Sequence, residues 1–178
     1  MEIKLKSIIS LLVISATSLS INTANAENTI IFNGAVSDTT CAVVLTGGAS
    51  TIELGATSVA DLTANNMGAP KSFSFAFTGC PAVADGGYGT AKMTFSGNSD
   101  TNPDYFKNEA ASDPATGVAI VILDGAGTVV KNNTAGSNID VSSGGVTVPY
   151  TARLVKSGAA APTKGPVQTT VTYNVTYQ

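Results

Sequence analysis

Alternating apolar and polar positions recur along the chain in short stretches, and this period of two predicts extended strands. The clearest stretch is KSFSFAFTGC, residues 71–80, in which Phe73, Phe75 and Phe77 share one face. Clusters rich in Gly, Asn, Asp and Pro separate the stretches, and such clusters form turns. Seven or more short strands at this spacing predict an all-β sandwich.

Further strands are expected at five places along the chain. They are TIELG (51–55), AKMTFSG (91–97), GVAIVILDG (117–125), VTVPYTARLV (146–155) and VQTTVTYNVTYQ (167–178). The stretch 117–125 is apolar on both faces, which suits a strand that is covered on both sides. Pro149 suggests that 146–155 is an edge strand or carries a bulge. Residues 56–70 are compatible with a short helical turn.

The first 26 residues have the pattern of a signal peptide. Lys4 and Lys6 precede the apolar run IISLLVIS, which is too short to span a bilayer, and ANA at 24–26 has the small residues of a cleavage site. A membrane anchor is the alternative, and the short apolar run disfavours it. We therefore expect an exported mature chain that begins at Glu27 and forms one domain.

An amphipathic strand is expected at each end of the mature chain. In TIIFNGAV, residues 29–36, one side of the extended chain carries Ile30, Phe32, Gly34 and Val36. Because an unpaired strand edge attracts further strands, proteins normally cover it. Two interpretations stay open at this point: both end strands pair inside a complete sandwich, or one end is meant for another subunit.

Composition narrows the chemistry that the chain can perform. The 178 residues include no histidine, only 12% are charged, and the formal net charge is −3. A Ser-His-Asp or Cys-His device needs a histidine, so we expect no enzyme and no catalytic residues. A mildly acidic chain without basic clusters is a poor candidate for binding nucleic acid. Asp100 and Asp104 lack the spacing of a known calcium loop, so neither a metal site nor a cofactor is expected.

The chain contains two cysteines, Cys41 and Cys80. An exported protein with two cysteines is expected to pair them in a disulfide. The alternatives are two free thiols or two metal ligands. Two cysteines without any histidine cannot complete a usual zinc site, which favours the disulfide.

The mature chain resembles a structural subunit of a chaperone–usher fimbria, of the type 1 and P pilus kind. The resemblance rests on TIIFNGAVSDTTC (29–41), on FSFAFTGC ending at Cys80, and on the C-terminal pattern. In that pattern Gly165 is fourteenth from the end, apolar residues alternate, and Tyr177 is the penultimate residue. The resemblance covers essentially all of residues 27–178, and the C-terminal pattern is its most specific part.

The resemblance implies an incomplete immunoglobulin-like β-sandwich that lacks its last strand. Residues 27–36 would be a donor strand, and residues 37–178 would be the pilin domain. Ile30, Phe32, Gly34 and Val36 would enter a groove in a neighbouring pilin subunit, after a periplasmic chaperone has left it at an outer-membrane usher. The residues implied for the strand that borders this groove and pairs with the chaperone are Gly165, Val171, Tyr173, Val175, Tyr177 and Gln178.

The function implied by the resemblance is bacterial adhesion through a fimbrium on the cell surface. Head-to-tail addition of one subunit to the next does not close on itself and therefore yields a filament. We expect the major shaft subunit, which forms a homopolymer. A minor adaptor pilin and a sugar-binding fimbrial adhesin are the alternatives, and the outside partner would be a host glycan or receptor. Tyr88 and Tyr105 lie in expected loops and do not by themselves make a sugar platform.

Overall fold

The computed structural model describes residues 40–47 and 50–178. The predicted signal peptide, the predicted donor strand with Ile30, Phe32, Gly34 and Val36, and the domain boundaries at residues 26 and 36 lie outside the described residues. The elements within the described part are β1 (Ala42–Leu45), α1 (Val59–Asn65), β2 (Lys71–Thr78), a 3-10 helix (Val83–Asp85), β3 (Thr90–Ser96), β4 (Phe106–Lys107), β5 (Val118–Asp124), β6 (Ile139–Asp140), β7 (Gly145–Lys156) and β8 (Thr172–Tyr177).

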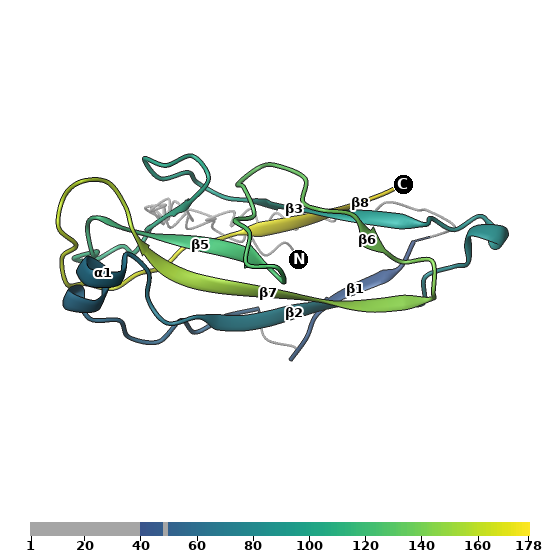
Figure 1. Ribbon diagram of the computed structural model, residues 1–178, viewed down its shortest axis with the longest axis horizontal. Helices are drawn as coiled ribbons and strands as arrows, with labels where there is room; N and C mark the ends of the chain where they lie inside the picture. Colours follow the sequence, from purple (N-terminus) through teal and green to yellow (C-terminus); the bar gives the residue numbers. More distant parts are fainter. Residues whose placement is uncertain (1–39, 48–49) are drawn as a thin grey trace, which may run out of the picture. The chain divides into compact units, whose positions relative to one another are not determined.

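The strands form two antiparallel sheets, which confirms the predicted all-β sandwich. One sheet has the order β1-β2-β7-β5-β4 and the other has the order β6-β3-β8. Figure 1 shows the two layers, with β3 and β8 on one side and β2 and β7 on the other. The central ladder joins β2 to β7 over eight residue pairs, from Lys71 opposite Ala152 to Thr78 opposite Gly145.

Apolar side chains of both sheets meet in one main core, as the alternating patterns predict. On β2, Phe75 and Phe77 are buried and Phe73 is half-buried, while Met93 and Phe95 of β3 are buried opposite them. The rings of Phe75 and Phe95 lie 6.0 Å apart between centroids, so the two sheets touch through aromatic side chains. Burial of such side chains is the main stabilising contribution to a fold of this size.

Strand β5 is covered on both faces, as its apolar pattern predicts. Val118, Ile120 and Ile122 face the main core. Ala119 and Val121 face the opposite way and form a second, smaller cluster with Val155 of β7. The partly buried residues that cover this second cluster are Met67, Tyr105, Leu123 and Val129.

Pro149 lies in the middle of a sheet and in an unbroken register, so the expectation of an edge strand or a bulge is wrong. β7 pairs with β2 on one side and with β5 on the other. Pro149 lies opposite Ser74, whose carbonyl accepts a hydrogen bond from Thr46 on the β1 side. The backbone groups of Pro149 therefore point away from β2, toward β5. The last residue pair between β5 and β7 is Asp124 with Tyr150, the neighbour of Pro149. Pro149 itself lies just beyond this ladder, so no ladder hydrogen bond needs an N–H from it.

The short helical turn expected between residues 56 and 70 is present as α1. Ser58 caps its N-terminus, because the Ser58 hydroxyl oxygen accepts a hydrogen bond of 3.0 Å from the Asp61 N–H. Asn66 ends it in the left-handed conformation, with φ of 59°. Leu62 is buried and joins the main core. None of the helices among the described residues has the length and apolarity to cross a membrane.

Residues 51–55 differ from the expectation, because they form no strand. Ile52 and Leu54 are nevertheless half-buried, while Thr51, Glu53 and Gly55 are exposed. The period of two therefore indicates the buried face correctly. A strand also requires a neighbouring backbone to pair with, and the pattern of side chains does not contain that information.

Candidate functional site

Two edge strands of the sandwich, β1 and β8, leave one border of each sheet open. β1 is the last strand of the larger sheet beside β2, and β8 is the last strand of the smaller sheet beside β3. Within residues 40–47 and 50–178, neither strand has a second neighbour. We call the border between them the β1–β8 seam. An unpaired strand edge is a template for another strand, which makes the seam the candidate functional site.

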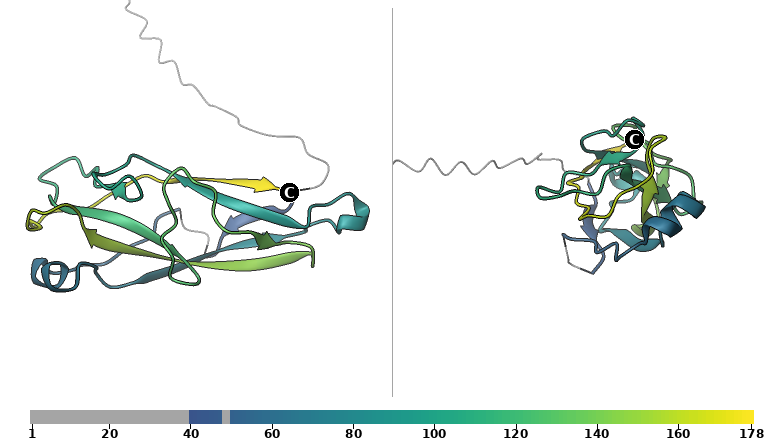
Figure 2. Two further views of the ribbon diagram at one scale, coloured as in Figure 1. Left: turned by 45° about the horizontal axis from the view of Figure 1, so that its top comes forward. Right: turned by 90° about the vertical axis from the view of Figure 1, so that its left-hand side faces the viewer.

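Side-chain contacts place the two open borders on the same side of the sandwich. The Tyr177 hydroxyl, at the end of β8, donates a hydrogen bond of 3.2 Å to the carbonyl of Cys41, just before β1. Farther along the seam, the Tyr173 ring lies 4.6 Å from the Phe75 ring between centroids, and Phe75 is paired with Leu45 of β1. β1 and β8 therefore run in opposite directions along the seam (Figures 1 and 2).

The backbone groups of alternate β8 residues face the seam. Gln178 and Thr90 exchange both of their backbone hydrogen bonds, at 2.8 and 3.1 Å, so the groups of Gln178 point toward β3. Because the direction alternates along a strand, the N–H and C=O groups of Tyr177, Val175 and Tyr173 point the other way. The seam is thus bordered on this side by three residues whose backbone donors and acceptors are available for pairing.

Strand β1 presents its backbone in the same manner. The N–H of Thr46 donates to the carbonyl of Ser74 at 2.8 Å, so the groups of Thr46 point toward β2. By alternation, Leu45, Val43 and Cys41 direct their backbone groups away from β2 and toward the seam. An inserted strand would therefore find ladder partners on both sides.

The seam is apolar between these two rows of backbone groups. Val43 and Leu45 of β1, and Val171, Val175 and Tyr177 at β8, are partly buried and pack against the main core. Tyr173 is 45% exposed although its ring touches Phe75. An apolar side chain that entered the seam would cover this exposed aromatic surface, which is favourable by about 25 cal/mol per Å² removed from water.

A disulfide and a hydrogen bond hold one end of the seam. Cys41 and Cys80 are bonded, with Cα atoms 4.2 Å apart, which confirms the predicted pairing. The bond joins the start of β1 to the end of β2, next to the pair Ala42 and Thr78. Burial raises the pKa of the Tyr177 hydroxyl, so at neutral pH it is protonated and can donate to the Cys41 carbonyl.

The residues predicted for the groove border fall into two groups. Tyr173, Val175 and Tyr177 lie in β8, Val171 directly precedes it, and the exposed Gln178 directly follows it. Gly165 lies instead in a bend seven residues before β8, with φ of +155°. A Cβ at this position would stand 2.5 Å from the Ala115 nitrogen and 2.8 Å from the Pro114 carbonyl carbon. Close backbone packing therefore explains the glycine.

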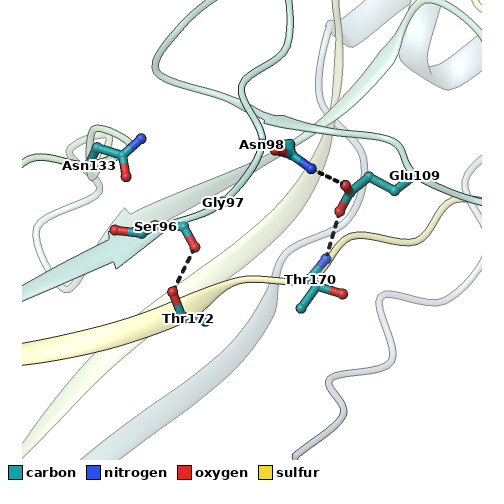
Figure 3. Close-up of a pocket in the computed structure, with 7 residues that line it drawn as sticks. All are labelled: Ser96, Gly97, Asn98, Glu109, Asn133, Thr170 and Thr172. Carbon is teal, nitrogen blue, oxygen red and sulfur yellow. Dashed lines mark hydrogen bonds between the residues drawn. The ribbon is translucent and has the colours of Figure 1, made fainter.

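A shallow polar depression of about 480 Å³ lies at the start of β8 (Figure 3). The Glu109 carboxylate accepts hydrogen bonds from the Asn98 side chain and, at 3.2 Å, from the Thr170 N–H. Asn98 contributes most to lowering the pKa of Glu109, and Thr170 lowers it further. The Thr172 hydroxyl donates to the Ser96 carbonyl at 3.1 Å. These bonds attach the lead-in of β8 to the neighbouring loop, and their acceptors and donors are used within the protein.

The acidic residues and tyrosines singled out in the sequence have structural surroundings. Asp100 accepts a hydrogen bond from the Ser157 hydroxyl, and Asp104 forms a 3.9 Å ion pair with Lys131. The described residues contain no group of three or more His, Cys, Asp or Glu side chains that could hold a metal ion. Tyr88 is exposed and its ring lies 5.7 Å from that of Tyr177, whereas Tyr105 is half-buried in the second cluster.

The site is thus an apolar seam between two edge strands of a β-sandwich, flanked by two rows of outward-directed backbone groups, and such an edge can accept a further strand. The chain belongs to the fimbrial protein family, because the model of that family matches residues 30–178. It is 34% identical to a type 1 fimbrial subunit of Salmonella typhimurium over 84% of this chain and 82% of the relative. It is 28% identical to the Pap fimbrial major pilin protein of Escherichia coli over 85% and 84%, respectively.

Solved structures place the fold in the same family. A subunit of a chaperone–usher pilus, studied for the uncoiling of its rod, matches with a TM-score of 0.66 and 26% identity, covering 86% of this chain and 97% of that one. The P pilus rod subunit PapA matches with a TM-score of 0.66 and 28% identity, covering 78% and 99%. The predicted immunoglobulin-like pilin sandwich and the chaperone–usher type of fimbrial subunit are thus confirmed. These relatives are structural subunits of surface pili, exported through the periplasm, and not enzymes.

Two features of the site are not contained in the sequence patterns. The Tyr177 hydroxyl bond to Cys41 joins residues that are 136 positions apart, and the bonds that Glu109 accepts from Thr169 and Thr170 span 60 and 61 positions. Neither leaves a local signal, since a single Glu in a polar loop is most often only solvated. Alternation places Tyr177 on the inner face of its strand, and the family resemblance marks it as the penultimate residue, but neither indicates the bond of its hydroxyl to Cys41.

Proposed function

We propose that this chain is the major shaft subunit of a chaperone–usher fimbria and polymerises by donor-strand complementation. The observation that carries the proposal is the β1–β8 seam, with apolar side chains between two rows of available backbone groups. Residues 27–36 supply the complement, because Ile30, Phe32 and Val36 share one face of an extended chain, with Gly34 between the last two. Inserted into a neighbour's seam, three such side chains would contribute on the order of 5–8 kcal/mol before ordering costs.

The geometry of the seam restricts how a donor strand fits. Because β1 and β8 run in opposite directions, an inserted strand is parallel to one of them and antiparallel to the other. The side chains of the inserted strand that face the core would contact the place where the rings of Tyr173 and Phe75 lie together, with centroids 4.6 Å apart. Gly34, in the middle of the donor, would pass such a place without a side chain. A periplasmic chaperone would occupy the same seam before assembly at the outer-membrane usher.

The terminal carboxylate of Gln178 is the proposed anchor for the chaperone. One Gln178 carboxylate oxygen accepts two hydrogen bonds from Thr90, one from the Thr90 N–H at 3.1 Å and one from the Thr90 hydroxyl at 3.4 Å. Gln178 itself is exposed, so a basic side chain of a partner could approach the carboxylate. A charge-assisted hydrogen bond there would fix the register of the chaperone strand along β8.

The proposal that this is the major subunit is supported by two relatives, the Pap major pilin and the P pilus rod subunit. Counting copies of this chain against other subunits in purified fimbriae tests it. One or a few copies per fibre would make it a minor adaptor and overturn the shaft assignment. Adhesion would then follow from the fibre as a whole, through whichever host glycan or receptor the fibre reaches.

Deletion of residues 27–36 from the mature chain tests the donor role. We expect the shortened subunit to co-purify with its chaperone, because its seam is intact, and to form no homopolymer in electron micrographs. Gly34→Leu should behave in the same way, and Asn33→Leu, on the other side of the strand, is the matched control that should polymerise. Normal fibres from the deletion variant would refute donor-strand complementation.

A further inference from the structure

The Tyr177 hydroxyl already occupies one of the acceptors that face the seam. Cys41, Val43 and Leu45 direct their backbone groups toward the seam, and the Tyr177 hydroxyl donates to the Cys41 carbonyl at 3.2 Å. Among the described residues, no donor bonds to the carbonyls of Val43 and Leu45, so these two β1 acceptors are open to a strand that enters the seam. At Cys41 it meets a carbonyl that is bonded and a phenol ring that stands beside it.

The hydroxyl is held in place from several directions. The next residue, Gln178, is fixed to Thr90 by two backbone hydrogen bonds, and the ring of Tyr177 lies against the ring of Tyr88. The acceptor is equally fixed, because Cys41 is bonded to Cys80. Donor and acceptor of this hydrogen bond are thus both anchored to the sandwich, which keeps the cost of ordering them low.

Side-chain alternation alone leaves the register of a strand in the seam ambiguous. A slip of one residue turns the apolar side chains outward and is strongly disfavoured. A slip of two residues keeps the same face of the donor strand inward. That face carries only apolar residues or glycine, namely Ile30, Phe32, Gly34 and Val36, so it remains compatible with the apolar seam after the slip. Alternation therefore does not exclude the two-residue slip, and a stop at the end of the seam would act together with the fit of Gly34 beside Tyr173.

We propose that the Tyr177 hydroxyl closes the disulfide end of the β1–β8 seam and so fixes the register of the inserted strand. Tyr177 acts as a positioning residue: it satisfies the Cys41 carbonyl, ends the ladder on β1 at Val43 and limits how far the incoming strand can advance. The inference rests on the proposed function, since it concerns how that strand is seated.

The test uses the chaperone-bound mature subunit and a synthetic peptide of residues 27–36 that carries a photoreactive leucine analogue in place of Ile30. Cross-linking followed by mass spectrometry reports which seam residues the analogue touches. We expect one set of contacts for the wild type and, for Tyr177→Phe, a second set displaced by two residues toward Cys41. Loss of one net hydrogen bond corresponds to about a 2- to 12-fold change in the ratio of the two registers.

Two further variants separate the hydroxyl from the ring. Tyr88→Phe removes the hydroxyl of the neighbouring ring and should keep the wild-type set. Tyr177→4-aminophenylalanine restores a donor at the same place and should restore a single register. A merely structural role of the Tyr177 ring would leave all three variants alike, because each keeps the ring.

A second measurement needs no change in the subunit, and therefore decides the matter even if Tyr177→Phe does not fold. Peptides with single N-methylated amides are bound to the wild-type subunit. Methylation should be tolerated at the amide nearest Cys41 and should weaken binding about 2- to 12-fold at the amide that reaches Val43. Equal weakening at both places, or an unshifted single contact set for Tyr177→Phe, would overturn the inference alone. Absence of any peptide insertion into the wild type would overturn the proposed function and this inference with it.

Discussion

Replacement of Gly165 by alanine distinguishes two roles for this glycine. The family resemblance assigns it to the strand that the chaperone contacts, whereas its surroundings indicate a packing role before β8. A Cβ added there would stand 2.5 Å from the Ala115 nitrogen and 2.8 Å from the Pro114 carbonyl carbon, and closer still to the Asp113 carbonyl oxygen. All three atoms belong to the backbone, so none of them can rotate away.

The expected cost follows from the two independent penalties at this position. Forcing an extra carbon into a packed place costs about 1–3 kcal/mol. A backbone conformation that non-glycine residues rarely adopt costs a further 1–3 kcal/mol or so, and Gly165 has φ of +155°. We therefore expect Gly165→Ala to lower the free energy of unfolding by about 2–6 kcal/mol, a large part of the stability of an ordinary domain.

The assay is urea unfolding of the mature subunit complemented with the donor peptide, followed by circular dichroism. Gly158→Ala is the matched control, because Gly158 also has positive φ, of 75°, but no atom lies within 4 Å of the added Cβ. The free energy of unfolding of the control should fall only by the conformational penalty, about 1–2 kcal/mol. If Gly165→Ala were as stable as the control and only chaperone binding fell, the packing explanation would be refuted.

Three further predictions concern the disulfide, the polar depression and the aromatic core. Replacing Cys41 and Cys80 together by alanine should cost about 4 kcal/mol in urea unfolding, because the closed loop spans 39 positions; an unchanged midpoint in reductant would contradict this. The pKa of Glu109 is lowered, so its stabilising contribution is present above its ordinary value of 4.5 and is lost as the pH falls through the lower folded-state pKa; Glu109→Gln should flatten that part of the stability profile, and parallel profiles would count against it. Phe75→Ala should cost about 3–5 kcal/mol and also weaken donor-peptide binding, measured by calorimetry, because the contact with Tyr173 is lost; unaltered peptide affinity would disprove the second half.

The faces of the strands could be predicted from the sequence because burial follows a period of two. Phe75, Phe77, Met93 and Phe95 are buried where alternation places them, and the doubly apolar stretch that became β5 is covered on both faces. Strand neighbours could not be derived in this way. Pro149 is an example, because its missing N–H costs no ladder hydrogen bond only since the last β5–β7 pair is at the neighbouring Tyr150.

The candidate site was predictable in part, because local sequence patterns indicate a strand but not the distant strands that lie beside it. The alternation of Tyr173, Val175 and Tyr177 is local and marks the strand. That β8 ends the smaller sheet, opposite β1 of the larger one, depends on the order of strands far apart in sequence. The position of Gly165 outside the strand shows that a pattern shared with a family can contain residues with separate physical roles.

The disulfide at the start of β1 determines how the subunit would carry tension in a fibre. In the proposed assembly, residues 27–36 are held by the neighbouring subunit, so a pull along the fibre enters the domain at Cys41. β1 has only four residues, so its ladder with β2 is short. The covalent bond passes the force directly to Cys80 and from there to β2, which pairs with β7 over eight positions. Force that enters at Cys41 would therefore reach the central ladder without first passing along β1.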